Sequence, residues 1–245
     1  MNNILWVTLF ILLIFGFSGI CQDSFQTDTI RTGEGELTIT FIGHGTLMFT
    51  FKGKVVHVDP VSRYADYSSM PKADLILVTH HHGDHLDSSA IVQVSKDETS
   101  YIYSKACEGK LPDSFPLQNG DEITIKGVTI QAVPAYNLVH KRDNGEPFHP
   151  KGIGNGYVIT FGDQKVYIAG DTENVPEMKQ LTGIEIAFLP MNLPYTMTPV
   201  MVADATRAFK PKILYPYHFG RTDVNELLKL LRDFPDTEIR IRKME

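Results

Sequence analysis

A dense group of metal-binding side chains follows a short apolar run and constrains this sequence more than any other feature. Residues 75–78 are Leu-Ile-Leu-Val, which is typical of a buried β-strand. Shortly after it stand four side chains that can bind a metal: His80, His82, Asp84 and His85. We therefore expect ligands at the end of a strand, on a turn that the glycine between His82 and Asp84 makes easy.

The spacing within this group predicts two metal sites. His80 and His82 are two residues apart, so in an extended segment they point to the same side, whereas His81 points away. Beyond the glycine the chain can turn, and Asp84 and His85 can then face a second point. Imidazole and carboxylate ligands suit zinc, and also manganese or iron. Because one ion takes three or four protein ligands, the group needs partners from elsewhere in the chain.

Two further apolar runs also end in a potential ligand. Residues 166–169 are followed, after one glycine, by Asp171, and residues 213–217 are followed by His218. Ligands gather at the carboxyl ends of strands in α/β sheets, so we expect these two side chains to converge on the histidine-rich turn. Asp59 ends another apolar run and is expected to orient a ligand histidine or the turn itself.

The order of the apolar runs predicts an α/β fold in which two sheets pack together with helices outside. Alternation and turn residues predict strands at residues 37–42, 47–51, 55–58, 75–78, 101–103, 122–126, 128–133, 157–161, 166–169, 185–189, 213–217 and 238–242. Helical patterns and caps predict helices at residues 88–94, 105–110, 175–181, 199–209 and 223–234. Residues 136–156 are expected to form a long irregular loop, and such loops are usually functional.

The turn at residues 80–85 resembles the His-x-His-x-Asp-His signature of the metallo-β-lactamase superfamily. Asp59, this turn, Asp171 and His218 match, in order, all but one of the positions that carry such residues in the superfamily, over roughly residues 37–242. The sequence is most similar to the lactonase-like branch of metal-dependent hydrolases in three short segments: Gly43-His44, Val133-Pro134-Ala135 and Ala169-Gly170-Asp171-Thr172. The resemblance implies an αββα four-layer sandwich.

One position departs from the pattern of that superfamily. Where a lone histidine commonly follows Val-Pro-Ala, this chain has Tyr136-Asn137, and an amide is a weak zinc ligand. We expect His149, in a proline-flanked segment, to complete the first metal site. His140, Asn137 and an incomplete site remain alternatives.

The leading hypothesis is a hydrolase with two ions, most simply zinc. His80, His82 and His149 would hold the first ion, Asp84, His85 and His218 the second, and Asp171 would bridge them. A metal-bridged hydroxide would attack an ester, lactone or phosphodiester, with Asp84, Asp171 and His44 as the catalytic residues. The alternatives are a metal-binding protein without activity on the same fold and a di-iron redox protein. Six residues in loops could rim the pocket: Tyr64, Tyr67, Met70, Phe148, Tyr195 and Met197.

Composition narrows the partners. The 245 residues carry a net charge of −6, which argues against the basic face that nucleic-acid binding needs, so we expect a small-molecule substrate. Nothing in the sequence fixes the oligomeric state. Cys107 is expected to be a buried structural thiol.

The N-terminus predicts export to the periplasm or cell envelope. Residues 4–17 are almost wholly apolar, with a length that fits a signal peptide better than a membrane span. We expect a signal peptide at residues 1–21, a linker at 22–36 and a hydrolase domain at 37–245. Soluble secretion, lipid attachment at Cys21 and an uncleaved anchor remain open, and any membrane contact would be through this segment.

Overall fold

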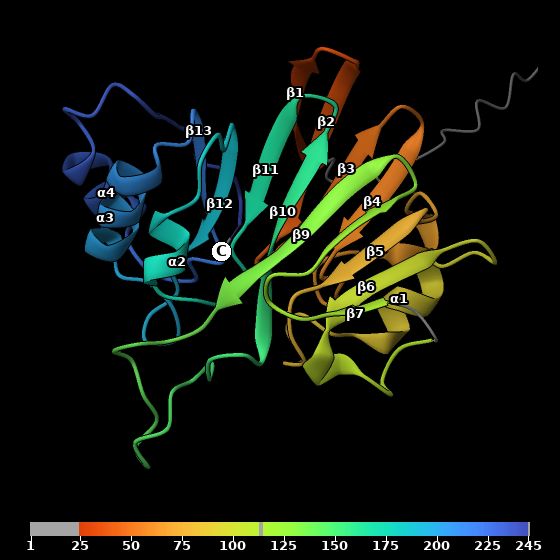
Figure 1. Cartoon of the computed structure of the whole chain (residues 1–245), viewed down its shortest axis with the longest axis horizontal. Helices are drawn as coiled ribbons and strands as arrows, with labels where there is room; N and C mark the ends of the chain where they lie inside the picture. The colour runs from red at the N-terminus through yellow and green to blue at the C-terminus, as the bar shows by residue number, and fades with distance from the viewer. Residues whose placement is uncertain (1–24, 113–114, 245) are drawn as a thin grey trace, which may run out of the picture.

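Two β-sheets lie face to face, with helices on their outer sides (Figure 1). The computed structural model describes residues 25–112 and 115–244, and each sheet in this part of the chain has seven strands. The first sheet contains β1 (Gln26–Thr32), β2 (Gly35–Gly43), β3 (Thr46–Phe51), β4 (Lys54–Val58), β5 (Leu75–Val78), β6 (Ser100–Ser104) and β7 (Phe115–Leu117). The second contains β8 (Glu122–Ile125), β9 (Val128–Ala135), β10 (Gly154–Phe161), β11 (Gln164–Ile168), β12 (Ile186–Pro190), β13 (Ile213–Tyr217) and β14 (Glu238–Ile239). The helices are α1 (Ser88–Val94), α2 (Pro176–Lys179), α3 (Pro199–Phe209) and α4 (Val224–Leu230), with 3-10 turns η1 (Tyr67–Ser69) and η2 (Lys105–Cys107).

Both sheets follow the same order of strands. In the first sheet, β1 to β4 are antiparallel neighbours and β4 to β7 are parallel neighbours. In the second sheet, β8 to β11 are antiparallel and β11 to β14 are parallel. Parallel strands end at the same edge of a sheet, so the residues that follow β4 and β5, and those that follow β11 and β13, are brought together in pairs.

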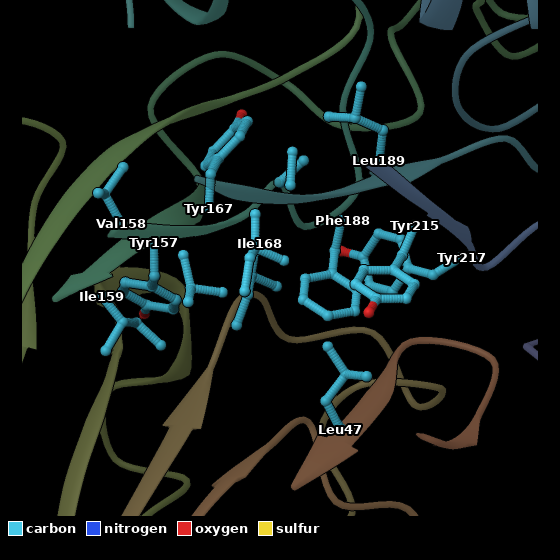
Figure 2. Packing of buried hydrophobic residues seen from close by; sticks show 14 of the residues in the cluster. Leu47, Tyr157, Val158, Ile159, Tyr167, Ile168, Phe188, Leu189, Tyr215 and Tyr217 are labelled. Atoms are coloured by element: carbon cyan, nitrogen blue, oxygen red, sulfur yellow. The ribbon is translucent and has the colours of Figure 1, made fainter. Parts of the chain in front are cut away.

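Aromatic rings fill the space between the two sheets. The ring centroid of Phe41 on β2 lies 4.9 Å from that of Tyr215 on β13, and Tyr215 stacks on Phe188 of β12 at 5.0 Å. Figure 2 shows Phe188, Tyr215 and Tyr217 side by side, with Leu47 approaching from the opposite sheet. Full burial of each such side chain contributes about 1.5–3 kcal/mol, so this layer holds the two sheets in a fixed relation.

The outer face of the second sheet packs against helices. Tyr167 and Leu189 point away from the inter-sheet layer in Figure 2, and the ring of Tyr167 lies 5.9 Å from that of Phe209 on α3. Thr198 caps the N-terminus of α3, and its side chain accepts a hydrogen bond from Met201 N. Because β12 and the buried part of β11, residues 166–168, are covered on both faces, their sequences are continuous apolar runs without alternation.

The outer face of the first sheet has a smaller apolar cluster under α1. Leu75 and Leu77 of β5 face the opposite sheet, whereas the alternate residues Ile76 and Val78 pack in this second cluster. Cys107 lies fully buried in it, and burial raises the pKa of its thiol to about 11. The expectation of a structural thiol is therefore confirmed.

The predicted αββα sandwich is confirmed, and β5, β13, α1 and α3 have the predicted bounds. The linker expected at residues 22–36 is wrong from Gln26 onward, because β1 pairs with β2 along its whole length, from Gln26 opposite Phe41 to Thr32 opposite Gly35. This strand lies at the edge of its sheet and is largely exposed, so its polar sequence hid it. α4 and β14 are shorter than predicted, and β7 was not predicted.

Asp28 fastens this edge strand to the C-terminal segment. Its carboxylate accepts hydrogen bonds from Arg242 Nη2 at 2.6 Å and Nε at 3.1 Å, from Arg240 Nη1 at 3.4 Å, and from the hydroxyl of Tyr215. Burial alone would raise the pKa of Asp28, but its bonds to Arg242 and Tyr215 outweigh that effect and lower it below 3.8.

We predict that Asp28→Asn lowers the free energy of unfolding by about 1.5–3 kcal/mol at pH 7, the range for hydrogen bonds to a charged group. Because the pKa of Asp28 is depressed in the fold, its contribution is complete above pH 3.8 and is lost as the pH falls below that value. Urea unfolding of both proteins at pH 7 and pH 3 measures the difference. A difference that does not shrink at acid pH would contradict this role.

The predicted signal peptide at residues 1–21, with Cys21, lies outside the described residues. No helix within residues 25–112 and 115–244 is long and apolar enough to span a bilayer.

Candidate metal centre

The predicted site residues meet where strands of both sheets end. The histidine-rich turn follows β5, Asp59 follows β4 and His44 follows β2, while Asp171 comes after β11 and His218 after β13. A backbone hydrogen bond from His218 N to His44 O, at 3.0 Å, ties the two sheets together at this edge. Side chains far apart in the sequence thus form one cluster.

His80, His82 and His149 form the first group of potential ligands. One ring nitrogen from each lies within 4.8 Å of the others, and His80 Nε2 is 3.1 Å from His82 Nδ1. Nitrogens around one tetrahedral zinc ion, at about 2.0–2.1 Å from it, are about 3.3 Å apart. The spacing therefore fits a shared ion. His81 belongs to none of the ligand groups found among the described residues, as its position in the motif predicts.

The second group of potential ligands lies around Asp84 and His218. His85, which the sequence placed with them, instead forms a group with His80 and Asp171. Asp84 Oδ2 is 3.6 Å from His218 Nε2 and 3.9 Å from His85 Nε2. His44 joins this group, since its Nε2 lies 3.3 Å from the same carboxylate oxygen and its ring centroid is 3.6 Å from that of His218. The sequence predicted His44 as a catalytic residue, whereas the geometry also allows it to contribute a nitrogen ligand.

Asp171 stands between the two groups and presents one oxygen to each. Its Oδ2 is 3.2 Å from His149 Nε2 and 3.8 Å from His80 Nε2. Its Oδ1 is 3.4 Å from His85 Nε2 and 3.5 Å from His218 Nε2. A carboxylate in this position can bridge two cations, as the sequence predicted for Asp171.

Several polar atoms at the centre of the cluster have no hydrogen-bond partner although they are buried. They are His85 Nε2, Asp171 Oδ1 and His218 Nε2. A buried polar atom without a partner costs about 1–3 kcal/mol, so three of them pointing together are unusual in a finished core. A metal ion would satisfy all three, and this donor set suits zinc.

Asp59 orients the histidines of both groups. Its Oδ2 accepts from His85 Nδ1 at 2.7 Å and from Thr79 Oγ1 at 2.7 Å, while Oδ1 accepts from Thr79 N at 2.8 Å. Because Thr79 Oγ1 donates to Asp59, it accepts from His80 Nδ1, 3.0 Å away. Both histidines then carry their proton on Nδ1 and leave Nε2 free for a metal.

Asn137 orients the ring of His149. Asn137 Oδ1 accepts from His149 N at 2.8 Å and from His149 Nδ1 at 2.7 Å, which frees Nε2 to face Asp171. The alternative in which Asn137 is itself a ligand does not fit, since the amide oxygen, the atom that would bind a metal, already accepts both bonds from His149, and the amide nitrogen donates to Glu173 Oε1 and to Tyr195 O. The prediction of His149 as the third member of the first group agrees with this arrangement.

Glu173 holds the loop that carries Asn137. Its fully buried carboxylate accepts three backbone hydrogen bonds at 2.7 Å, from Leu138 N, Val139 N and His140 N. It also accepts from His140 Nδ1 at 2.7 Å, and His140 belongs to none of the ligand groups found among the described residues, which argues against His140 as the third ligand. Burial raises the pKa of Glu173, but these hydrogen bonds outweigh burial and lower it, so the carboxylate is charged at neutral pH.

The buried carboxylates set the charge balance of the centre. Burial lowers the pKa of His85, but Asp171 and Asp59 beside it outweigh burial and raise that pKa well above its ordinary value. Conversely, burial and the neighbouring histidines lower the pKa of His82 to about 4. Positive charge is thus favoured at His85, between Asp59 and Asp171, and disfavoured at His82.

The backbone at the site is unusual in three places. His44, Asp59 and His218 adopt left-handed φ values of 54°, 45° and 47°. Such conformations cost about 1–3 kcal/mol at residues with a side chain and tend to cluster at functional sites. They aim these side chains from the strand ends into the cluster.

The sequence assigned the turn of the motif to Gly83, but the position at which the site requires a glycine is Gly45. A Cβ on Gly45 would lie 2.8 Å from His85 Cε1 and 3.4 Å from His218 Cδ2, so glycine is needed there. A Cβ on Gly83 would meet nothing within 4 Å, and its φ is not left-handed. The turn of the motif therefore does not depend on Gly83.

A cleft of about 490 Å³ opens onto the cluster. Its polar lining includes His44, His82, Asp84, His149, Asp171, Asn192 and His218. Of the predicted rim residues, Tyr64, Phe148 and Tyr195 line it. Tyr67 and Met197 are fully buried and Met70 packs in the cluster under α1, so these three predictions are wrong.

The comparisons with known proteins agree with this centre. The family described as the beta-lactamase superfamily domain matches residues 38–218. The chain belongs to this family. A UPF0173 metal-dependent hydrolase of Methanopyrus kandleri is 32% identical over 200 residues, which cover 75% of this chain and 84% of the relative. As a member of the superfamily, the chain is a metal-dependent hydrolase.

Solved structures show the same fold. A metal-dependent hydrolase from Parabacteroides distasonis is 52% identical, with a TM-score of 0.86, over 90% of this chain and 100% of that one. Igni18, a metallo hydrolase from Ignicoccus hospitalis, is 22% identical with a TM-score of 0.69, over 85% of this chain and 96% of the other. The latter likeness concerns the fold alone.

Sequence reasoning did not single out Thr79, Glu173 or Gly45 in this superfamily member. Thr79 directly precedes His80, and Glu173 stands two residues after Asp171, so position beside a predicted ligand was the available signal. Their partners could not be foreseen, because each contacts a segment remote in the sequence.

We predict that Asn137→Ala weakens binding of the first metal ion by about 10- to 100-fold, because His149 loses the acceptor that orients it. Zinc titration against a competing chelator measures this. Asn144→Ala is the control, since within the described part of the chain the side chain of Asn144 hydrogen-bonds only with Glu146 in the same exposed turn. Equal zinc affinity in the two variants would refute the role of Asn137.

A second prediction for this centre concerns the short distance between Gly45 and the ring of His85. Gly45→Ala should displace His85 and reduce the bound metal, whereas Gly83→Ala should retain it. Elemental analysis of the purified variants gives the metal content. Full metal content in the Gly45 variant would show that the short distance between Gly45 and His85 does not restrict metal binding.

Proposed function

We propose that this superfamily member hydrolyses a small ester, lactone or phosphodiester with two divalent metal ions, preferentially zinc. The first ion would be held by His80, His82 and His149, and the second by Asp84, His85 and His218. The observation that carries the proposal is Asp171, whose two oxygens each face one group at 3.2–3.8 Å. Ions in such a centre polarise a carbonyl or phosphoryl oxygen and make water a nucleophile near neutral pH.

The residues of the chain would share the remaining work. His44 and Asp84 lie on the cleft wall, and the His44 Nε2 to Asp84 Oδ2 separation of 3.3 Å lets this pair accept and pass on a proton during the reaction. Asp84 is accessible for this, since 43% of its side chain is exposed. Asp171, at 4%, is shielded from water and keeps the two groups at a fixed separation.

The cleft supports a small-molecule substrate. Its volume lies in the range of 300–1,000 Å³ that is typical of ligand pockets. Phe148 and Tyr195 form an apolar wall, with their ring centroids 5.0 Å apart. Among the described residues that line the cleft, the two tyrosines alone carry a hydroxyl group, and none carries a thiol. The lining therefore offers no serine or cysteine nucleophile.

We predict that Asp171→Ala abolishes bound metal and turnover together. The wild-type protein, loaded with zinc, is assayed on a panel of lactones, phosphodiesters and β-lactams, and its metal content is measured in parallel. Asp97→Ala, which changes an exposed carboxylate away from the centre, should retain both. Full metal content and turnover in the Asp171 variant would refute the bridging role. Metal-loaded wild type without turnover on any class would argue against this substrate range.

A further inference from the structure

Two arginines at the mouth of the cleft are not used by the proposed chemistry. Arg63 lies in the loop after β4 of the first sheet, and Arg142 lies in the loop between β9 and β10 of the second. Both line the same cleft as Asp84, Asp171 and His218. The two arginines thus reach the same cleft from opposite halves of the sandwich.

Neither arginine has a carboxylate partner within the described part of the chain. The ion pairs found there include other arginines, such as Arg240 with Glu238, but neither Arg63 nor Arg142. The acidic residues of the cleft are Asp84 and Asp171. In the proposed centre both carboxylates are neutralised by divalent cations, so the two arginines leave the cleft with an excess of positive charge.

The position of Arg142 is built into its loop. Its Nη2 donates to Phe148 O at 3.3 Å, and its guanidinium lies 5.1 Å from the centroid of the Phe148 ring. Arg142 N donates to Glu146 O at 2.7 Å, and Lys141 pairs with Pro147 in a β-bridge, so the loop forms a closed turn. The guanidinium is therefore held beside Phe148 on the cleft wall, and its other N–H groups have no hydrogen-bond partner among the described residues.

Resting on the proposed function, we infer that the substrate carries an anionic group, a carboxylate or a phosphate, which Arg63 and Arg142 bind while the scissile bond lies at the metal centre. Arginine suits this role because its planar donors match both anions. Tyr64 and Asn192 line the same cleft and offer further polar groups. Neutral substrates would lack this anchoring and be bound less tightly.

The test compares three 4-nitrophenyl esters that differ in the far end of the acyl chain. The butanoate ester is neutral, the glutarate ester carries a carboxylate and the 4-phosphonobutanoate ester carries a phosphonate. kcat and KM are measured for zinc-loaded wild type, Arg63→Ala, Arg142→Ala and the double variant. Arg31→Ala is the control, because Arg31 is exposed on β1, away from the cleft.

We expect each cleft variant to raise KM for the anionic esters by about tenfold or more, with little change for the neutral ester. The larger effect, on the carboxylate or on the phosphonate, identifies the anion. Equal effects on neutral and charged esters, or none beyond the Arg31 control, would overturn the inference. Whichever result is found for the variants, turnover of the neutral ester by the wild-type protein still supports the proposed hydrolase function.

If zinc-loaded wild type hydrolyses none of the esters, ester hydrolysis fails as part of the proposed function, and binding decides the inference separately. Calorimetry then compares glutarate and 4-phosphonobutanoate with pentane-1,5-diol. Anion binding that weakens about tenfold in the Arg63 and Arg142 variants, and not in Arg31→Ala, supports the inference. Anion binding that is equal in all variants overturns it.

Discussion

The arrangement of the ligand residues at this edge of the sandwich depends on one buried carboxylate whose two oxygens face different groups of side chains. Asp171 directs one oxygen to His80 and His149 and the other to His85 and His218. A charged group that is almost fully shielded from water is costly unless opposite charge lies next to it. The two ligand groups therefore lie on either side of Asp171, where bound cations would compensate its buried negative charge.

The fold supplies this arrangement through its repeated order of strands. Each sheet has four antiparallel neighbours followed by parallel ones, so each contributes strand ends at the same edge. The aromatic layer of Phe41, Phe188 and Tyr215 keeps the two edges in register. No repeat is visible in the sequence, because the two halves share strand order and not side chains.

Much of the centre could be predicted, because its ligands lie directly after apolar strands. The turn at 80–85, Asp171 and His218 were recognised from that placement, and the structure brings them together. His149 was preferred to His140 because of its proline-flanked segment, whereas the hydrogen bond of His140 to Glu173, which distinguishes the two histidines in the structure, leaves no local pattern in the sequence. The edge strand β1 was missed for a different reason, since polar exposed strands lack the apolar signal.

The most direct measurement is anomalous diffraction at the zinc edge from crystals of the zinc-loaded protein. The account predicts two peaks, one beside Asp171 Oδ2 near His80, His82 and His149, and the other beside Asp171 Oδ1 near His85 and His218. One peak at a place that Asp171 does not reach, or no peak at this edge of the sandwich, would contradict it.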